Sequence, residues 1–123
     1  MKRLPLESWL LLLHVEFILR FRELDALHRF VRERQVKVSP DHRTPEYVCR
    51  SVDLACVFYF KRVLCLQRSA VTTVLLRRYG WKAEMVIGAQ ILPFKSHAWV
   101  EIEGKIVNDN PYMCEMYSVL ERC

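Results

Sequence analysis

The segment SHAWVEIEGKIVND, residues 96–109, contains the clearest β-hairpin pattern in the chain. Residues 97–102 and 105–109 are rich in β-branched and aromatic residues that alternate with polar ones, as in strands with one buried face. Glu103-Gly104 separates them, and glycine adopts at no steric cost the positive φ angles that tight turns require. The segment therefore predicts two antiparallel strands and a short turn.

The register of this hairpin decides whether two polar side chains meet. A three-residue loop at 102–104 sets His97 directly opposite Asp109, with their Cβ atoms ~5 Å apart on one face. A two-residue loop at 103–104 opposes His97 to Asn110 instead and turns Asp109 away.

A charge match favours the three-residue loop. That register sets Glu101 against Lys105, an opposite-charge pair of the kind that stabilises neighbouring strands. Asp109 then accepts a hydrogen bond from one ring nitrogen of the histidine and leaves the other nitrogen for a reacting group. Asn108 or Asn110 is the alternative side chain for that role.

Two helices are predicted before the strands. Thr44-Pro45-Glu46 supplies a capping hydroxyl, a first-turn proline and an acid near the positive end of the dipole, so a helix is expected from there to about Phe60. The next helix is expected to begin at Cys65 and to end near residues 77–79, where two arginines suit the negative end of the dipole. Gly80 suits the left-handed residue beyond the helix.

The N-terminal part of the chain predicts a helix over residues 6–34, bent or broken near residues 22–25. Its apolar stripe is Leu10, Leu13, Phe17, Phe21, Leu24, Leu27 and Val31. Core packing is the preferred interpretation of this stripe, and a protein-docking surface is the alternative. A linker over residues 35–43 divides the chain into an N-terminal helical segment, 1–43, and a core, 44–123.

The remaining segments complete an α+β fold of one compact unit. Alternation over residues 81–91 predicts another strand, and residues 93–96 predict a loop between it and the hairpin. Residues 112–123 form a tail, with a short strand as the alternative. Helices thus precede a small antiparallel sheet, the order typical of α+β domains.

Size and composition exclude several classes of protein. A chain of 123 residues with 52% hydrophobic and 27% charged residues has the size and composition of one globular domain. The net charge of +5 comes from scattered basic residues, so no nucleic-acid surface is indicated. Charged residues interrupt the apolar stretch that starts at Trp9 far short of the ~20 residues that span a bilayer. A soluble protein is expected, with no transmembrane segment and no signal peptide.

The cysteines indicate a reducing compartment. They are odd in number and include no CxxC pair: Cys49, Cys56, Cys65, Cys114 and Cys123. No disulfide framework, metal or cofactor is therefore expected, and the cytoplasm is the predicted location. Cys49 and Cys56 share a helix face and are expected to be small buried side chains, whereas Cys123 is expected to be mobile.

Cys65 has the position of a catalytic thiol. The unpaired amides and the dipole at a helix start stabilise a thiolate, and its backbone N–H is a candidate oxyanion donor. Such a nucleophile needs a base and a group that orients the base, roles that His97 and Asp109 fill. Further candidate oxyanion donors are Tyr59, Gln67 and Trp99.

Several motifs carry a family resemblance. They are CLQRSA at 65–70, LLRRYG at 75–80, VIG at 86–88, HAWVE at 97–101 and VND at 107–109. Over about residues 44–121 the chain resembles the transglutaminase-like superfamily, and in particular the leader peptidases of lasso-peptide biosynthesis, the stand-alone protease half of a split processing protein. The resemblance implies a papain-like core with Cys65 as nucleophile, His97 as base and Asp109 as orienting acid.

The resemblance also implies a function. It implies a cysteine protease that removes the leader from a lasso-peptide precursor through a thioester. A separate leader-binding recognition protein is the implied partner, with the ATP-using macrolactam synthetase as a further candidate, and the apolar N-terminal helix is a candidate docking surface. The alternatives are a thiol acyltransferase and a non-catalytic transglutaminase-like binding module.

Overall fold

The computed structural model describes residues 4–22, 24–36, 44–60, 62–90, 95–109 and 116–123. Its helices are α1 (Leu4–Phe21), α2 (Leu24–Glu33), α3 (Pro45–Val57) and α4 (Cys65–Arg78). Its strands are β1 (Ala83–Gln90), β2 (Lys95–Ile102), β3 (Lys105–Ile106) and β4 (Ser118–Arg122). The predicted α+β order, helices first and an antiparallel sheet second, is confirmed.

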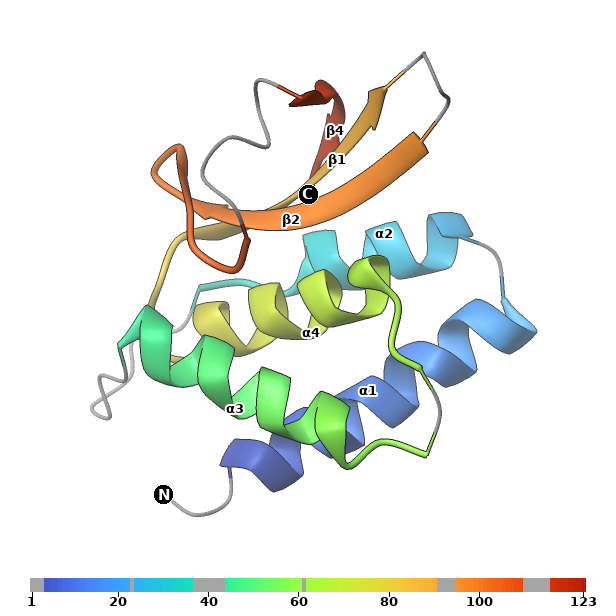
Figure 1. Cartoon of the computed structure of the whole chain (residues 1–123), viewed down its shortest axis with the longest axis vertical. Coiled ribbons are helices and arrows are strands. Elements are labelled where there is room, and N and C mark those ends of the chain that lie inside the picture. The colour runs from blue at the N-terminus through green and yellow to red at the C-terminus, as the bar shows by residue number, and fades with distance from the viewer. Residues whose placement is uncertain (1–3, 23, 37–43, 61, 91–94, 110–115) are drawn as a thin grey trace.

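One helix forms the centre of the molecule. The sheet has the strand order β3-β2-β1-β4, and each neighbouring pair is antiparallel. Helix α4 packs between this sheet and the pair α1 and α3 (Figure 1). Ten of its 14 residues are buried, and the buried hydroxyls of Thr72 and Thr73 donate to backbone carbonyls one turn earlier. For example, Thr73 donates to the carbonyl of Ser69 at 2.8 Å.

The predicted helix boundaries hold where local signals are strong. The hydroxyl of Thr44 accepts a hydrogen bond from the backbone N–H of Tyr47 at 3.2 Å, as an N-cap does. Helix α4 begins at Cys65, and Gly80 beyond its end has a φ of 94°. The break between α1 and α2 also lies where the sequence placed it, whereas α3 ends at Val57 rather than at Phe60. Most of the predicted linker, residues 37–43, lies outside the described residues.

Helix α1 buries a different face from the predicted one. Its buried residues are Leu4, Ser8, Leu12, Val15 and Ile18. The predicted stripe faces outward instead, with exposed fractions of 51% for Leu10, 40% for Leu13, 58% for Phe17 and 68% for Phe21. Apolar residues surround most of this helix, so periodicity alone does not select the face that packs. In α2 the expected core residues Leu27 and Val31 are buried.

The C-terminal segment is an ordered strand, so the expectation of a mobile Cys123 is wrong. Strand β4 pairs with β1, and beyond it the backbone N–H and carbonyl of Cys123 both hydrogen-bond Met85, at 2.8 and 3.1 Å. Its side chain is buried. None of the helices in the described part of the chain combines the length and apolar character that crossing a bilayer requires.

The guanidinium of Arg77 joins the end of α4 to distant parts of the chain. It is buried and donates to the carbonyls of Ala83 at 2.9 Å, Cys123 at 2.7 Å and Arg34 at 3.2 Å, and also to that of Val31. Desolvation lowers the pKa of Arg77 below its ordinary value, yet the hydrogen bonds occupy all three of its nitrogens. One side chain thus ties α2, β1 and the C-terminal strand to α4.

We expect Arg77→Met to lower the free energy of unfolding by about 3 kcal/mol, because several buried carbonyls lose their donor. Arg78→Met is the matched control: Arg78 is exposed and lies 3.5 Å from Glu7, so its loss should cost less than about 1 kcal/mol. Urea unfolding measures both variants. Equal losses for the two variants would contradict the assignment.

Candidate active site

The hairpin between β2 and β3 does not have the predicted register. Glu103 and Gly104 have φ angles of 51° and 78°, which form a two-residue turn of type I′. Glu101 pairs with Ile106 and Ile102 with Lys105, so the predicted three-residue loop is wrong. Strand β3 is also shorter than predicted and ends before residue 107.

Glu101 explains why the charge match misled. Its side chain is buried and accepts hydrogen bonds from Nε1 of Trp99 and from Nη1 of Arg122, both at 2.8 Å. These donors lie on β2 and β4, so Glu101 joins two strands of the sheet rather than the two sides of the hairpin. The two positive φ angles of the turn set the register.

Asp109 nevertheless reaches His97. The backbone N–H of Val107 donates to the carbonyl of Val100 at 3.0 Å, which continues the ladder for one step. At the next residue a side chain takes over, because Oδ1 of Asn108 accepts from the N–H of Val100 at 2.8 Å. The chain leaves the strand there, and Oδ2 of Asp109 lies 2.6 Å from Nε2 of His97.

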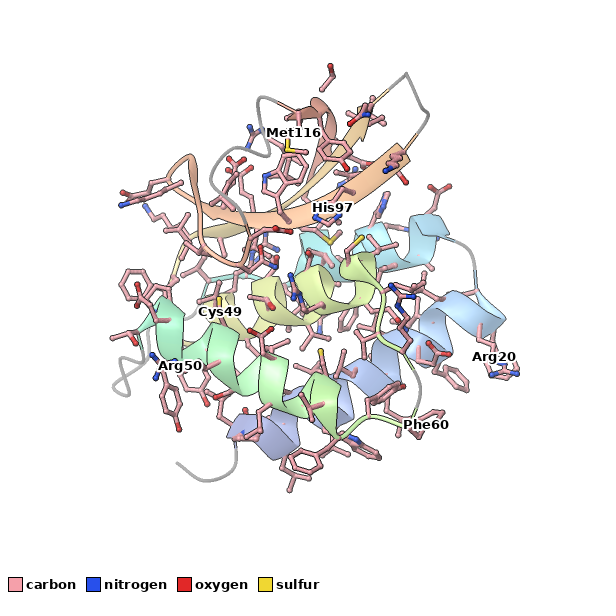
Figure 2. The ribbon with its side chains drawn as sticks, in the orientation of Figure 1. Arg20, Cys49, Arg50, Phe60, His97 and Met116 are labelled. Carbon is pink, nitrogen blue, oxygen red and sulfur yellow. The ribbon has the colours of Figure 1, made fainter. Side chains whose placement is uncertain are left out.

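Cys65 and His97 share one cavity. The cavity has a volume of about 120 Å³ and is lined by Cys65, Leu66, Ile87, Ser96, His97 and Ala98. Figure 2 shows His97 on β2, between the sheet and the helices. An imidazole that donates from Nε2 to a carboxylate keeps its basic lone pair on Nδ1. The arrangement thus places a thiol, a basic ring nitrogen and a small apolar space together.

Aromatic rings hold the imidazole from the sheet side. The ring of His97 stacks on Tyr117 at 5.7 Å and on Trp99 at 6.3 Å between centroids. Gly88 pairs with His97 across the strands, and a Cβ there would lie 2.7 Å from Trp99 and 2.9 Å from Tyr117. The glycine therefore permits the close approach of these rings.

The side chains proposed as oxyanion donors are engaged elsewhere. The hydroxyl of Tyr59 donates to the carbonyl of Leu12 at 3.5 Å, and the indole N–H of Trp99 donates to Glu101. Gln67 caps α4, since its Oε1 accepts from the N–H of Leu64 at 3.0 Å while its amide nitrogen donates to Glu16. The backbone N–H of Cys65 remains as a candidate, because the first amides of a helix have no acceptor within it.

The other thiols of the described residues do not line this cavity. Cys49 and Cys56 are half-buried on α3, and the thiol of Cys49 donates to the carbonyl of Val107 at 3.6 Å. Burial, with Asp53 as a second cause, raises the pKa of Cys49 to about 11. Burial also raises the pKa of Cys56 and of Cys123.

A group of side chains that could hold a metal ion was not predicted from the sequence. Within the described residues, His28, Glu121 and Cys123 bring ligand atoms within 4.8 Å of one another. They come from α2 and from the C-terminal strand, so no spacing in the sequence reveals them. Glu121 forms an ion pair with Arg32, and its other carboxylate oxygen lies 3.0 Å from Nδ1 of His28. The carboxylate therefore already has a cationic partner in Arg32.

Comparison with known proteins agrees with this architecture. A model of the transglutaminase-like superfamily matches residues 9–122, and the chain belongs to that superfamily. The chain is also similar to the microcin J25-processing protein McjB of Escherichia coli, with 39% identity over 56 residues. The match covers 46% of this chain and 27% of McjB, so the chain spans about a quarter of the length of that curated relative. No solved structure matches the chain significantly.

We expect iodoacetamide to alkylate Cys49 slowly in the folded protein. At pH 8, a pKa raised from 9.0 to about 11 lowers the thiolate fraction, and with it the rate, about 100-fold. Peptide mass spectrometry over time measures the rate, with the protein in concentrated urea as the control. A rate in native buffer equal to that in urea would refute the expectation.

The same pKa shift predicts alkaline instability. The folded state binds the thiol proton of Cys49 more tightly than the unfolded state, so this contribution to stability is complete below pH 9.0 and is lost as the pH rises to about 11. Urea unfolding across that range measures it, and Cys49→Ala should flatten the dependence.

Proposed function

We propose that this protein is a cysteine peptidase that removes the leader peptide from a lasso-peptide precursor. Cys65 is the proposed nucleophile, His97 the base and Asp109 the acid that orients the base. The observation that carries the proposal is the 2.6 Å contact between His97 and Asp109 beside the cavity that His97 shares with Cys65. Membership of the transglutaminase-like superfamily and similarity to McjB support the class of reaction and the substrate.

The proposed reaction proceeds through a thioester. Sγ of the Cys65 thiolate attacks the carbonyl carbon of the peptide bond between leader and core, and the carbonyl oxygen takes up the electron pair. The N–H of Cys65 is the proposed donor to that oxygen. The Nδ1 atom of His97, which has taken the thiol proton of Cys65, gives that proton to the leaving amine of the core as the oxyanion collapses and the C–N bond breaks.

Water completes the cycle. His97 takes a proton from a water molecule that attacks the thioester, and the C–S bond breaks to release the leader as a free carboxylic acid. Throughout, Asp109 accepts from Nε2 of His97 and so directs Nδ1 toward the thiol. We propose the cytoplasm as the location of the reaction, because free cysteines such as the four described ones persist in a reducing compartment.

An apolar face supports a role for a partner protein. In the described part of the chain, ten large apolar residues of α1, of α3 and of the segment after α3 are exposed, and three of them, Leu6, Leu54 and Phe58, lie together on this face. A groove lined in part by Leu6, Trp9 and Phe58 joins α1 to α3. Apolar surfaces of this extent mark interaction sites in soluble proteins. We propose that a separate leader-binding recognition protein docks here, and that a macrolactam synthetase takes the released core.

We expect Cys65→Ala to abolish cleavage of a lasso-peptide precursor, because no other described thiol lines the cavity. Asp109→Ala should retain weak activity, with kcat lowered about 10³-fold, since the nucleophile remains while the base loses its orientation. Intact-mass analysis with and without the recognition protein measures the products. The matched control is Cys56→Ala, which replaces a half-buried cysteine of α3, and this variant should cleave like the wild type.

The products separate this proposal from its alternatives. A free leader acid supports the peptidase, whereas an amide-linked adduct identifies an acyltransferase. Cleavage that persists in Cys65→Ala rejects the nucleophile. Absence of any product from every precursor tested, with or without the recognition protein, would instead favour a binding module.

The apolar face has its own test. We expect Phe58→Glu to weaken binding of the recognition protein more than about 10-fold, because a charge would be buried at the interface. Leu120→Glu is the matched control, since Leu120 is 66% exposed but lies on β4. Calorimetric titration measures both. Equal affinities for the two variants would exclude this face as the docking site.

A further inference from the structure

We propose that Arg68 and Asn108 are positioning residues, which together fix the orienting acid Asp109 to the helix that carries Cys65. The inference rests on the proposed function and deepens it. In the observed hairpin register Asp109 should lie away from His97, yet the two side chains are in contact.

The strand pairing alone turns Asp109 away from His97. In the observed register Glu101 pairs with Ile106, so the same ladder, continued, would set Asp109 opposite Ala98. Neighbouring residues of a strand point to opposite faces of the sheet, so Asp109 would then lie on the opposite face from His97. Another interaction must therefore redirect the chain before residue 109.

Asn108 provides one part of that redirection. Its Oδ1 accepts from the N–H of Val100 on β2 at 2.8 Å, and its Nδ2 donates to the hydroxyl of Ser69 on α4 at 3.4 Å. The side chain thus takes the place of a backbone acceptor in the ladder. It anchors the residue before Asp109 to both β2 and α4, and the backbone is freed to turn.

Arg68 provides the other part. It lies one turn after Cys65 on α4, and its Nη2 donates to the backbone carbonyl of Asn108 at 3.1 Å. The same nitrogen lies 3.9 Å from Oδ2 of Asp109, while Nη1 lies 3.6 Å from Oδ1 of Asp53 on α3. One terminal nitrogen of the guanidinium therefore contacts both the main chain and the carboxylate of the loop, while the other faces α3.

Helix α4 thus sets two of the three proposed catalytic groups. It presents the Cys65 thiol at its first residue and fixes the Asp109 carboxylate through Arg68 and Ser69, while β2 carries His97. Because proton transfer and attack depend on sub-ångström placement, loosening the acid should lower turnover more than binding. The contacts lie away from the cavity, so they belong to positioning and not to substrate recognition.

The first test is kinetic. We expect Arg68→Met and Asn108→Ala each to lower kcat for precursor cleavage about 10²-fold while KM changes less than about 3-fold. Arg68→Lys should recover less than about a tenth of the lost activity, because it keeps the charge but not the planar, pre-organised geometry that directs the terminal nitrogen at the loop. Asp53→Asn is the matched control: it removes the outer partner of Arg68, which is largely exposed, and should stay within about 2-fold of the wild type.

The second test needs no substrate. The proton shared by Nε2 of His97 and Asp109 should give a low-field proton NMR signal in the wild type that Asp109→Ala lacks. We expect the signal to be lost or shifted in Arg68→Met and in Asn108→Ala while urea unfolding remains cooperative. If Arg68→Met does not fold, Arg68→Lys takes its place, with the same loss expected.

The outcomes separate the two proposals. An unchanged signal and unchanged kcat in the Arg68 and Asn108 variants would overturn the positioning role and leave the peptidase intact. A wild type that cleaves no precursor would remove the proposed function, and the NMR signal would still decide how the loop is held. A fall in kcat matched by an equal rise in KM would assign Arg68 to substrate binding and so overturn the inference.

Discussion

The buried guanidinium of Arg77 is the constraint on which the arrangement of this protein depends. It stands at the end of the central helix α4 and binds carbonyls from α2, from the start of β1 and from Cys123 beyond β4. A buried carbonyl without a donor costs about 1–3 kcal/mol, so these segments assemble around the side chain. Because the end of α4 is fixed in this way, the direction of the whole helix is fixed, and with it the place of Cys65 at the opposite end.

The candidate site is the point where the start of that helix meets the sheet. The helix brings the thiol, strand β2 brings the imidazole, and the segment after β3 brings the carboxylate. Thiol chemistry of the proposed kind needs a base beside the thiol, and the meeting of this helix start with β2 brings the two groups to one cavity. Rings from β2 and from the segment before β4 pack on His97, so the base is held by packing as well as by its hydrogen bond.

Local signals in the sequence predicted much of the fold and correctly located most helix ends, because a cap such as Thr44 or a glycine such as Gly80 acts within one turn. The sequence-based predictions failed where contacts between distant parts of the chain decide which of two arrangements forms. The outward face of α1 and the buried pairing of Glu101 both depend on partners that sequence spacing does not reveal. The contact between His97 and Asp109 was expected on the basis of a register that the chain does not adopt, and a side chain, that of Asn108, makes it possible.

Gly88 limits where the surroundings of His97 can be altered by substitution. Since a Cβ at Gly88 would lie 2.7 Å from Trp99 and 2.9 Å from Tyr117, no side chain fits at this position without displacing these rings. The shape of the cavity can instead be varied at Leu66, Ile87 and Ala98, whose side chains line it. Libraries that vary those three positions and spare the glycine would reshape the cavity without displacing the rings that stack on His97.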